Sequence, residues 1–191
     1  MGRKLNGYGT ETCVTTTSTL AQSQARTLQR HMIGHGMLIL LVGLLAGGGL
    51  LVSLTGGLEV WPGRLLAVRV PGDSAAWVRF HIGQLLNAFL IVMVALILPV
   101  LGVALTLARR VGWLIVGTGW ANTLFYAAAL FAPNRALTFG GNRFGAANGA
   151  SLIGLVPALV FAVVSIVAVL VLAAQSFRRP VWPATQDRGG I

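Results

Sequence analysis

Long apolar stretches dominate this sequence, and four of them contain no Asp, Glu, Lys or Arg. They cover residues 31–58, 80–108, 111–134 and 144–177. Each is longer than the roughly 20 residues that an α-helix needs to cross a hydrocarbon core of about 30 Å. The pattern therefore predicts an all-α fold, in which four transmembrane helices form the bundle of an integral membrane protein.

Turn-forming residues set the expected ends of these helices. The predicted ranges are approximately Gly34 to Thr55, Arg79 to Leu105, Val111 to Phe131 and Ser151 to Gln175. Gly56 and Gly57 end the first helix, and Pro133 stops the third because the residue before a proline disfavours helix. Arg109 and Arg110 alone separate the second and third stretches, so these two helices should be antiparallel neighbours.

The sequence divides into a membrane domain and two tails. The membrane domain is expected at 31–177, between a disordered, cytoplasmic N-terminal tail at 1–30 and a C-terminal tail at 178–191. The N-terminal tail is polar and rich in Thr, and it lacks the apolar core of a cleaved signal peptide. It contains Cys13, the single cysteine of the sequence, so no disulfide can form within the chain.

Composition and charge agree with a membrane location. Hydrophobic residues make up 55% of the chain and charged residues 9%, which leaves too little polar surface for a soluble domain of this size. The net charge is +10, but the cations cluster at the ends of the apolar stretches and indicate lipid headgroups rather than nucleic acid as the partner. The side that would hold both termini carries nine cations against five on the other, which places both termini in the cytoplasm.

The second predicted helix begins with Arg79 and His81 and carries Gln84 and Asn87 deeper in the span. A histidine at a helix end can lie in the headgroup layer, or its neutral imidazole can be an axial ligand of iron. His81 and Asn87 are six residues apart. That spacing rotates the helix by about 600°, so the two side chains point about 120° apart. One helix therefore cannot easily aim both at one small centre.

Thr118, Asn122 and Tyr126 are spaced i, i+4, i+8 in the third predicted helix and share one face. A threonine in such a helix usually bonds to the backbone carbonyl four residues earlier. Asn122 and Tyr126 can either line a site or form interhelical hydrogen bonds, which contribute about 1 kcal/mol each. The four stretches contain no carboxylate, and this argues against a proton-coupled transporter built on buried acids.

The positions of the three histidines limit how a haem could be held. His31 and His35 are four residues apart at the start of the first helix, but no Cys or acid lies nearby in sequence to complete a metal site. His81 starts the second helix, so an antiparallel arrangement places it about 30 Å from the other two, across the membrane. Bis-histidine ligation is therefore excluded. A haem on His81 would keep its sixth position open unless Met or Tyr filled it.

Several distinctive segments follow one another in an order that resembles the styrene oxide isomerases, and the similarity covers about residues 31–178. These segments are GHG at 34–36, TGGLEVWPG from Thr55, VPG at 70–72, His81-x-Gly83-x-x-x-Asn87, GWAN from Gly119, Phe125-Tyr126, and PNRALTFGGNRFG from Pro133 to Gly145. The resemblance implies a homotrimeric enzyme of the bacterial inner membrane that isomerises aryl epoxides to aldehydes, as in the Meinwald rearrangement of styrene oxide to phenylacetaldehyde. It also implies that ferric haem b, bound between subunits, acts as a Lewis acid on the epoxide oxygen before a 1,2-hydride shift.

The resemblance assigns roles to residues already singled out. Carried over by position, His81 would be the axial ligand of the haem iron. Asn87, Asn122 and Tyr126 would line the substrate side as catalytic residues. The chain departs from the family pattern at Thr118, where an aspartate is expected, and in its longer N-terminal tail.

Other functions also fit a small apolar bundle. A membrane haem protein that transfers electrons, like a cytochrome b, would need two strong axial ligands, and the sequence offers no second histidine in the right place. A structural bundle or small transporter would hold no haem. If haem is bound, Arg79 is the expected cofactor-binding arginine, and Arg135 and Arg143 are the alternatives for its propionates.

Overall fold

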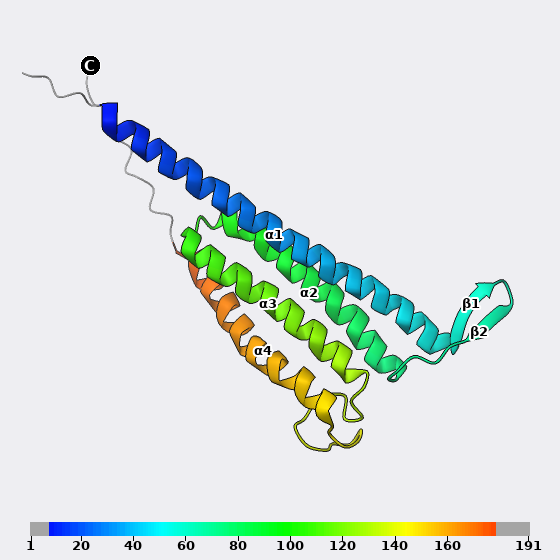
Figure 1. The fold of residues 1–191 in the computed structure, drawn as a ribbon. Coiled ribbons are helices and arrows are strands. Elements are labelled where there is room, and N and C mark those ends of the chain that lie inside the picture. Colours follow the sequence, from blue (N-terminus) through cyan, green and yellow to red (C-terminus); the bar gives the residue numbers. More distant parts are fainter. Residues whose placement is uncertain (1–7, 179–191) are drawn as a thin grey trace, which may run out of the picture.

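The computed structural model describes residues 8–178, which form an elongated bundle of helices that run back and forth (Figure 1). The four helices are α1 (Tyr8–Thr55), α2 (Ser74–Val100), α3 (Leu105–Ala129) and α4 (Gly149–Ser176). Among the helices of this described part, α2 packs against α1 and α3, whereas α4 packs against α3 alone. The prediction of a mainly helical fold with four helices is confirmed.

The first helix differs most from its prediction. It begins at Tyr8 rather than near Gly34, so most of the segment expected to be disordered is helical. Two properties of that segment favour the helix: its Ala, Gln, Arg and Leu residues are good helix formers, and Leu28 is buried in the bundle core. Residues 1–7 of the predicted N-terminal tail and 179–191 of the C-terminal tail lie outside the described residues.

A β-hairpin between α1 and α2 is a second departure from the all-α prediction. Strands β1 (Gly57–Trp61) and β2 (Arg64–Ala67) pair antiparallel. The segment has the composition of a hairpin, because aliphatic and aromatic residues flank a Pro-Gly turn.

Within residues 8–178, three helices are long and apolar enough to cross a membrane, namely Leu20–Thr55, Ser74–Val100 and Gly149–Ser176. Helix α3 is not among them, since polar residues such as Asn122 and Thr123 lower its hydropathy. Only 17% of the most apolar window of α4 is buried, against 44% for α2. Most of α4 therefore faces outward, where lipid or another protein chain can cover it.

The bundle core and the loop after α3 hold the elements in register. Ile39, Ile91 and Ile115 from three helices meet at the centre and are each fully buried. In the loop, the buried Asn134 side chain donates hydrogen bonds to the carbonyl oxygens of Thr138 at 2.8 Å and Gly140 at 3.0 Å. Arg135, in the same loop, forms an ion pair with Asp73. The Asp73 side chain also caps α2 by accepting a hydrogen bond from Ala76 N at 2.7 Å.

Candidate active site

The imidazole of His81 is held by the backbone of α1. Its Nδ1 lies 2.8 Å from the carbonyl oxygen of Gly43. A carbonyl oxygen can only accept, so Nδ1 carries the proton and donates it in this bond. In the neutral ring, Nε2 is then left with a free lone pair. Metal-ligating histidines commonly have this arrangement, in which one ring nitrogen donates to a carbonyl and the other binds the metal.

Two glycines of α1 make room for this arrangement. A Cβ atom added at Gly47 would lie 3.0 Å from both Cε1 and Nδ1 of His81. One added at Gly43 would lie 3.0 Å from the Cβ of Gln84. The glycines are four residues apart, so they share one face of α1 and allow the close helix approach typical of small residues at membrane helix interfaces.

The Asn87 side chain contacts α3, whereas His81 contacts α1, as the angle of about 120° between them on α2 predicted. Nδ2 of Asn122 on α3 donates a hydrogen bond of 2.9 Å to Oδ1 of Asn87. The interhelical hydrogen bond considered from the sequence is thus present. It uses only half of each amide, so the NH2 group of Asn87 and the carbonyl oxygen of Asn122 can still meet a ligand.

Tyr126 lies against α2 on the same side of α3 as Asn122. Its ring stacks on Phe80, with centroids 6.2 Å apart and an interplanar angle of 27°. It also covers Gly83, where an added Cβ atom would overlap the tyrosine ring and hydroxyl. Packing therefore sets the position of the ring, and Gly83 brings the phenol close to the backbone of α2, one turn from Arg79.

Thr118 faces α4, whereas Asn122 and Tyr126, which are on the same helix, face α2. Its hydroxyl donates to the carbonyl oxygen of Leu114 at 2.9 Å, the backbone bond expected of such a threonine. The same hydroxyl lies 3.5 Å from the carbonyl oxygen of Phe161 on α4. Each step of four residues rotates the helix by about 40°, which is enough over two steps to turn Thr118 toward α4.

Of the three candidate arginines, Arg79 has the most suitable environment for an anionic ligand. Its Nε and one terminal nitrogen are buried and have no hydrogen-bond partner among the residues that the structure describes. Arg135 is paired with Asp73 and also lies over the ring of Phe144, 4.0 Å from its centroid. Arg143 lies over the same ring at 4.7 Å. A buried N–H group without an acceptor costs free energy, so Arg79 is the arginine that gains most from an anion.

Gln84 is a buried polar residue that the site assignments from the sequence missed. It is fully buried between His81 and Asn87, with its side-chain amide 3.1 Å from the hydroxyl of Thr123. The Thr123 hydroxyl has two possible acceptors, Oε1 of Gln84 and the carbonyl oxygen of Gly119 at 2.9 Å. Nε2 of Gln84 is buried and has no hydrogen-bond partner among the residues that the structure describes. The i, i+3, i+6 spacing of the polar residues in α2 was the signal for this position.

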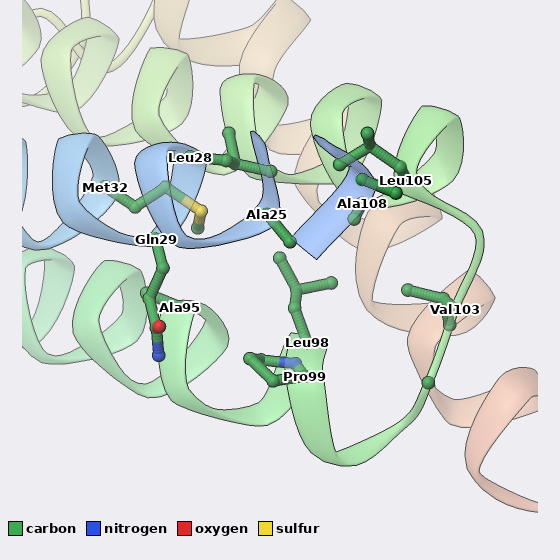
Figure 2. Close-up of a pocket in the computed structure, with 12 residues that line it drawn as sticks. Ala25, Leu28, Gln29, Met32, Ala95, Leu98, Pro99, Val103, Leu105 and Ala108 are labelled. Carbon is green, nitrogen blue, oxygen red and sulfur yellow. The ribbon is translucent and has the colours of Figure 1, made fainter. Parts of the chain in front are cut away.

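Neither of two sizeable cavities contains His81. One cavity, of about 330 Å³, lies between α1, the end of α2 and the start of α3, and Gln29 is its polar lining residue. Figure 2 shows the side chains that line it. A second cavity, of about 300 Å³, lies at the opposite end of the bundle beside Asp73, Arg135 and Phe144. A single chain therefore does not enclose the free nitrogen of His81 in either cavity.

The fold and the site define a helical protein with three candidate membrane spans among its described residues, and with His, Asn and Tyr side chains held at the contacts of α2 with α1 and α3. A family model described as styrene oxide isomerase matches residues 28–177. A styrene-oxide isomerase of Pseudomonas fluorescens is 41% identical over 150 residues, which cover 78% of this chain and 89% of that protein. The chain belongs to the styrene oxide isomerase family. The match confirms the family resemblance seen in the sequence. It also confirms the prediction that the protein is an enzyme, an isomerase, rather than an electron-transfer protein or a transporter.

Proposed function

We propose that this chain converts styrene oxide and related aryl epoxides to aldehydes at a haem site built on His81. The relative from Pseudomonas fluorescens, which carries the name styrene-oxide isomerase, supports the reaction. The observation that carries the site is the bond from His81 Nδ1 to the Gly43 carbonyl oxygen, which leaves Nε2 as a free ligand nitrogen.

The described residues fit haem b at both of its polar contacts. His81 would hold the iron through Nε2, and the buried N–H groups of Arg79, which have no acceptor within the described chain, would hold a propionate. Two residues rotate a helix by about 200°, so the Arg79 that meets a haem on His81 would belong to a neighbouring chain. Bound in the ferric state, the haem would supply a Lewis acid for the epoxide oxygen. No second described histidine lies at this end of the bundle, so a haem on His81 would receive no second imidazole from the residues around it.

The rearrangement needs no net proton or electron. The benzylic C–O bond opens, a hydride moves from the neighbouring carbon to the benzylic carbon, and the oxygen becomes that of the aldehyde. Tyr126 and Asn87 contribute by donating hydrogen bonds from the phenol and the NH2 group to the oxygen while negative charge develops there. Asn122 orients Asn87 through their 2.9 Å hydrogen bond. The apolar helices exclude water, which would otherwise trap the benzylic cation as a diol.

The direct test combines a product assay with a spectrum. The purified full-length protein should convert styrene oxide to phenylacetaldehyde, show a Soret band, and change that band when styrene oxide is added. Dithionite should lower turnover, because a less positive iron attracts the epoxide oxygen less strongly. A protein that forms the aldehyde without any haem would refute the haem site but keep the reaction, and one that forms no aldehyde would refute the proposed function.

In this proposal the chain crosses the bacterial inner membrane four times, with its termini in the cytoplasm, and forms a homotrimer with a haem between subunits. Helix α3 has 25 residues and packs between two candidate spans, which supports its crossing despite its polar residues.

His81 faces α1 while Asn87 faces α3. Two chains that each supply one of these residues could address one iron, which a single α2 helix cannot easily do.

Co-expression of two inactive chains would test the shared site. His81→Ala chains keep Asn87 and Asn87→Ala chains keep His81, so mixed oligomers should contain some sites with both residues intact. We expect activity above the sum of the two separate variants. The measurement is aldehyde formation by oligomers purified through two different tags, one on each chain. If such mixed oligomers show no added activity, each site belongs to one chain.

Adjacent glycines of α1 give a matched test of the His81 position. A Cβ at Gly47 would lie 3.0 Å from the imidazole, whereas one at Gly48 would have no atom within 4 Å. Gly47→Val should displace the ring, so the Soret band and the activity should fall about tenfold, in line with the loss of an outer contact that orients a metal ligand. Gly48→Val, with the same helix propensity cost, should keep both near wild type. Equal losses in the two variants would show that glycine is needed only for helix packing.

A further inference from the structure

The β1–β2 hairpin projects sideways from the end of α1, away from α2, α3 and α4 (Figure 1). Its register pairs Leu58 with Leu66 and Trp61 with Arg64. Leu66 and Arg64 are two residues apart on β2, so they and their partners lie on one face of the hairpin. A register shift between Glu59 and Trp61 accommodates the three-residue spacing of Leu58 and Trp61 on β1. We call Leu58, Trp61, Arg64 and Leu66 the hairpin face.

Apart from Arg64, the hairpin face is apolar, and it is uncovered in a single chain. Leu58 is 46% exposed, Leu66 is 56% exposed and Trp61, beside the turn, is 72% exposed. An isolated two-stranded hairpin is only marginally stable in water, and uncovered aliphatic side chains add no stability. On the opposite face Leu65 is similarly exposed, but it pairs with the charged Glu59, so the hairpin face is the one that another surface would cover.

Charge on this end of the molecule distinguishes the possible partners. Glu59 directs its carboxylate to the turn, where it accepts a hydrogen bond of 2.8 Å from Gly63 N, and Asp73 is paired with Arg135. The same end of the described chain carries five arginines, at positions 64, 69, 79, 135 and 143. A second copy would present the same excess of cations. Anionic lipid headgroups have the charge that complements this surface.

We propose that the hairpin face lies in the anionic headgroup layer of the bilayer beside α1, as an interfacial anchor. The inference rests on the membrane placement proposed above. The hairpin follows α1 directly, where that candidate span ends at Thr55. Leu58 and Leu66 reach the acyl boundary, Trp61 lies at the interface that tryptophan prefers, and Arg64 meets phosphate.

Spin labels at matched positions test the anchor. In a Cys13→Ser background, which removes the single cysteine, one cysteine is placed at Leu66, Leu65 or Leu45. Leu65 lies next to Leu66 on the opposite face and is 52% exposed, and Leu45 is 67% exposed on α1. The full-length protein is placed in vesicles of phosphatidylcholine and phosphatidylglycerol. Collisions of each label with oxygen, which concentrates in lipid, and with a water-soluble nickel chelate are then measured.

The inference expects labels at positions 66 and 45 to collide mainly with oxygen, and the label at position 65 to collide several times more often with nickel. A label at position 66 that is shielded from both reagents would show a protein partner and overturn the anchor. So would free access to nickel at position 66 while position 45 still reports lipid. If nickel reaches position 45 as well, the membrane placement of α1 itself is wrong.

The anionic part of the inference has its own test. Adding phosphatidylglycerol to phosphatidylcholine vesicles should raise the ratio of oxygen to nickel collisions at position 66. Arg64→Gln should remove that increase, whereas Arg178→Gln, at the other end of the bundle, should keep it. A ratio that does not depend on phosphatidylglycerol would refute the role of anionic lipid.

Discussion

His81→Ala should abolish the Soret band and lower aldehyde formation about a hundredfold or more. The variant removes the only described imidazole at this end of the bundle, and the polarisation that a bound metal supplies is worth several kcal/mol. Absorption spectra and product formation, measured on purified protein at equal concentration, test both effects. Loss of the band together with the activity would assign His81 to haem binding.

His35→Ala is the matched control for this result. The imidazole of His35 accepts a hydrogen bond from Nε1 of Trp120 at 3.2 Å and lies near the middle of α1, about 12 Å along the helix from Gly43 and so closer to His81 than the roughly 30 Å expected from the sequence. Its removal should leave the haem content unchanged. Free imidazole added to His81→Ala should also restore part of the Soret band, because it can occupy the space of the lost ring. A full haem complement in His81→Ala without added imidazole would rule out His81 as the ligand.

Tyr126→Phe should lower kcat at least about tenfold, which corresponds to about 1.4 kcal/mol in the barrier, while the Soret band stays near its original size. The substitution keeps the ring that stacks on Phe80 and removes only the hydroxyl. If that hydroxyl stabilises the developing charge on the epoxide oxygen, its loss should appear in kcat more than in KM. Steady-state kinetics with styrene oxide provide the measurement.

A second substitution separates the hydroxyl from the packing of the ring. Phe80→Leu disturbs the same ring stack without removing a polar group, so its main effect should be on thermal stability. Wild-type kinetics in Tyr126→Phe would place Tyr126 among the packing residues. A tenfold loss in Phe80→Leu equal to that in Tyr126→Phe would show that ring position, rather than the hydroxyl, controls turnover.

The structure also changes how Thr118 should be interpreted. It stands where the family resemblance leads to an aspartate, and a charge there could orient Tyr126. In this chain the Thr118 hydroxyl bonds within its own helix and approaches α4 instead of α2. The tyrosine ring is held by Phe80 and by the absence of a side chain at Gly83. Packing can therefore position the phenol without an acid at this site.

The sequence by itself determined the number of helices, the family and the divergence of His81 from Asn87. It was wrong about the link between α2 and α3, which it placed at Arg109 and Arg110; both lie inside α3, and the link is at residues 101–104. Charge-free stretches and the 3.6-residue period are local properties, so they can be read without knowing which helices touch. Residues 8–30 and the hairpin escaped this approach. Residues 8–30 are polar, and the burial of Leu28 against other helices supports their helical form. The hairpin is short, and its strands lack a strict alternation of apolar and polar residues.

The tertiary structure alone decided which partner each polar side chain meets. The bonds of His81 to Gly43, Asn87 to Asn122 and Gln84 to Thr123 join residues 35 to 39 positions apart. Such contacts depend on how helices rotate and pack, and no local pattern specifies that. The same packing left two buried nitrogens of Arg79 without an acceptor in the described part of the chain, while it paired Arg135 with Asp73. The sequence could therefore identify the candidate polar residues of this site, but only the packed bundle shows which of their atoms remain free to bind a ligand.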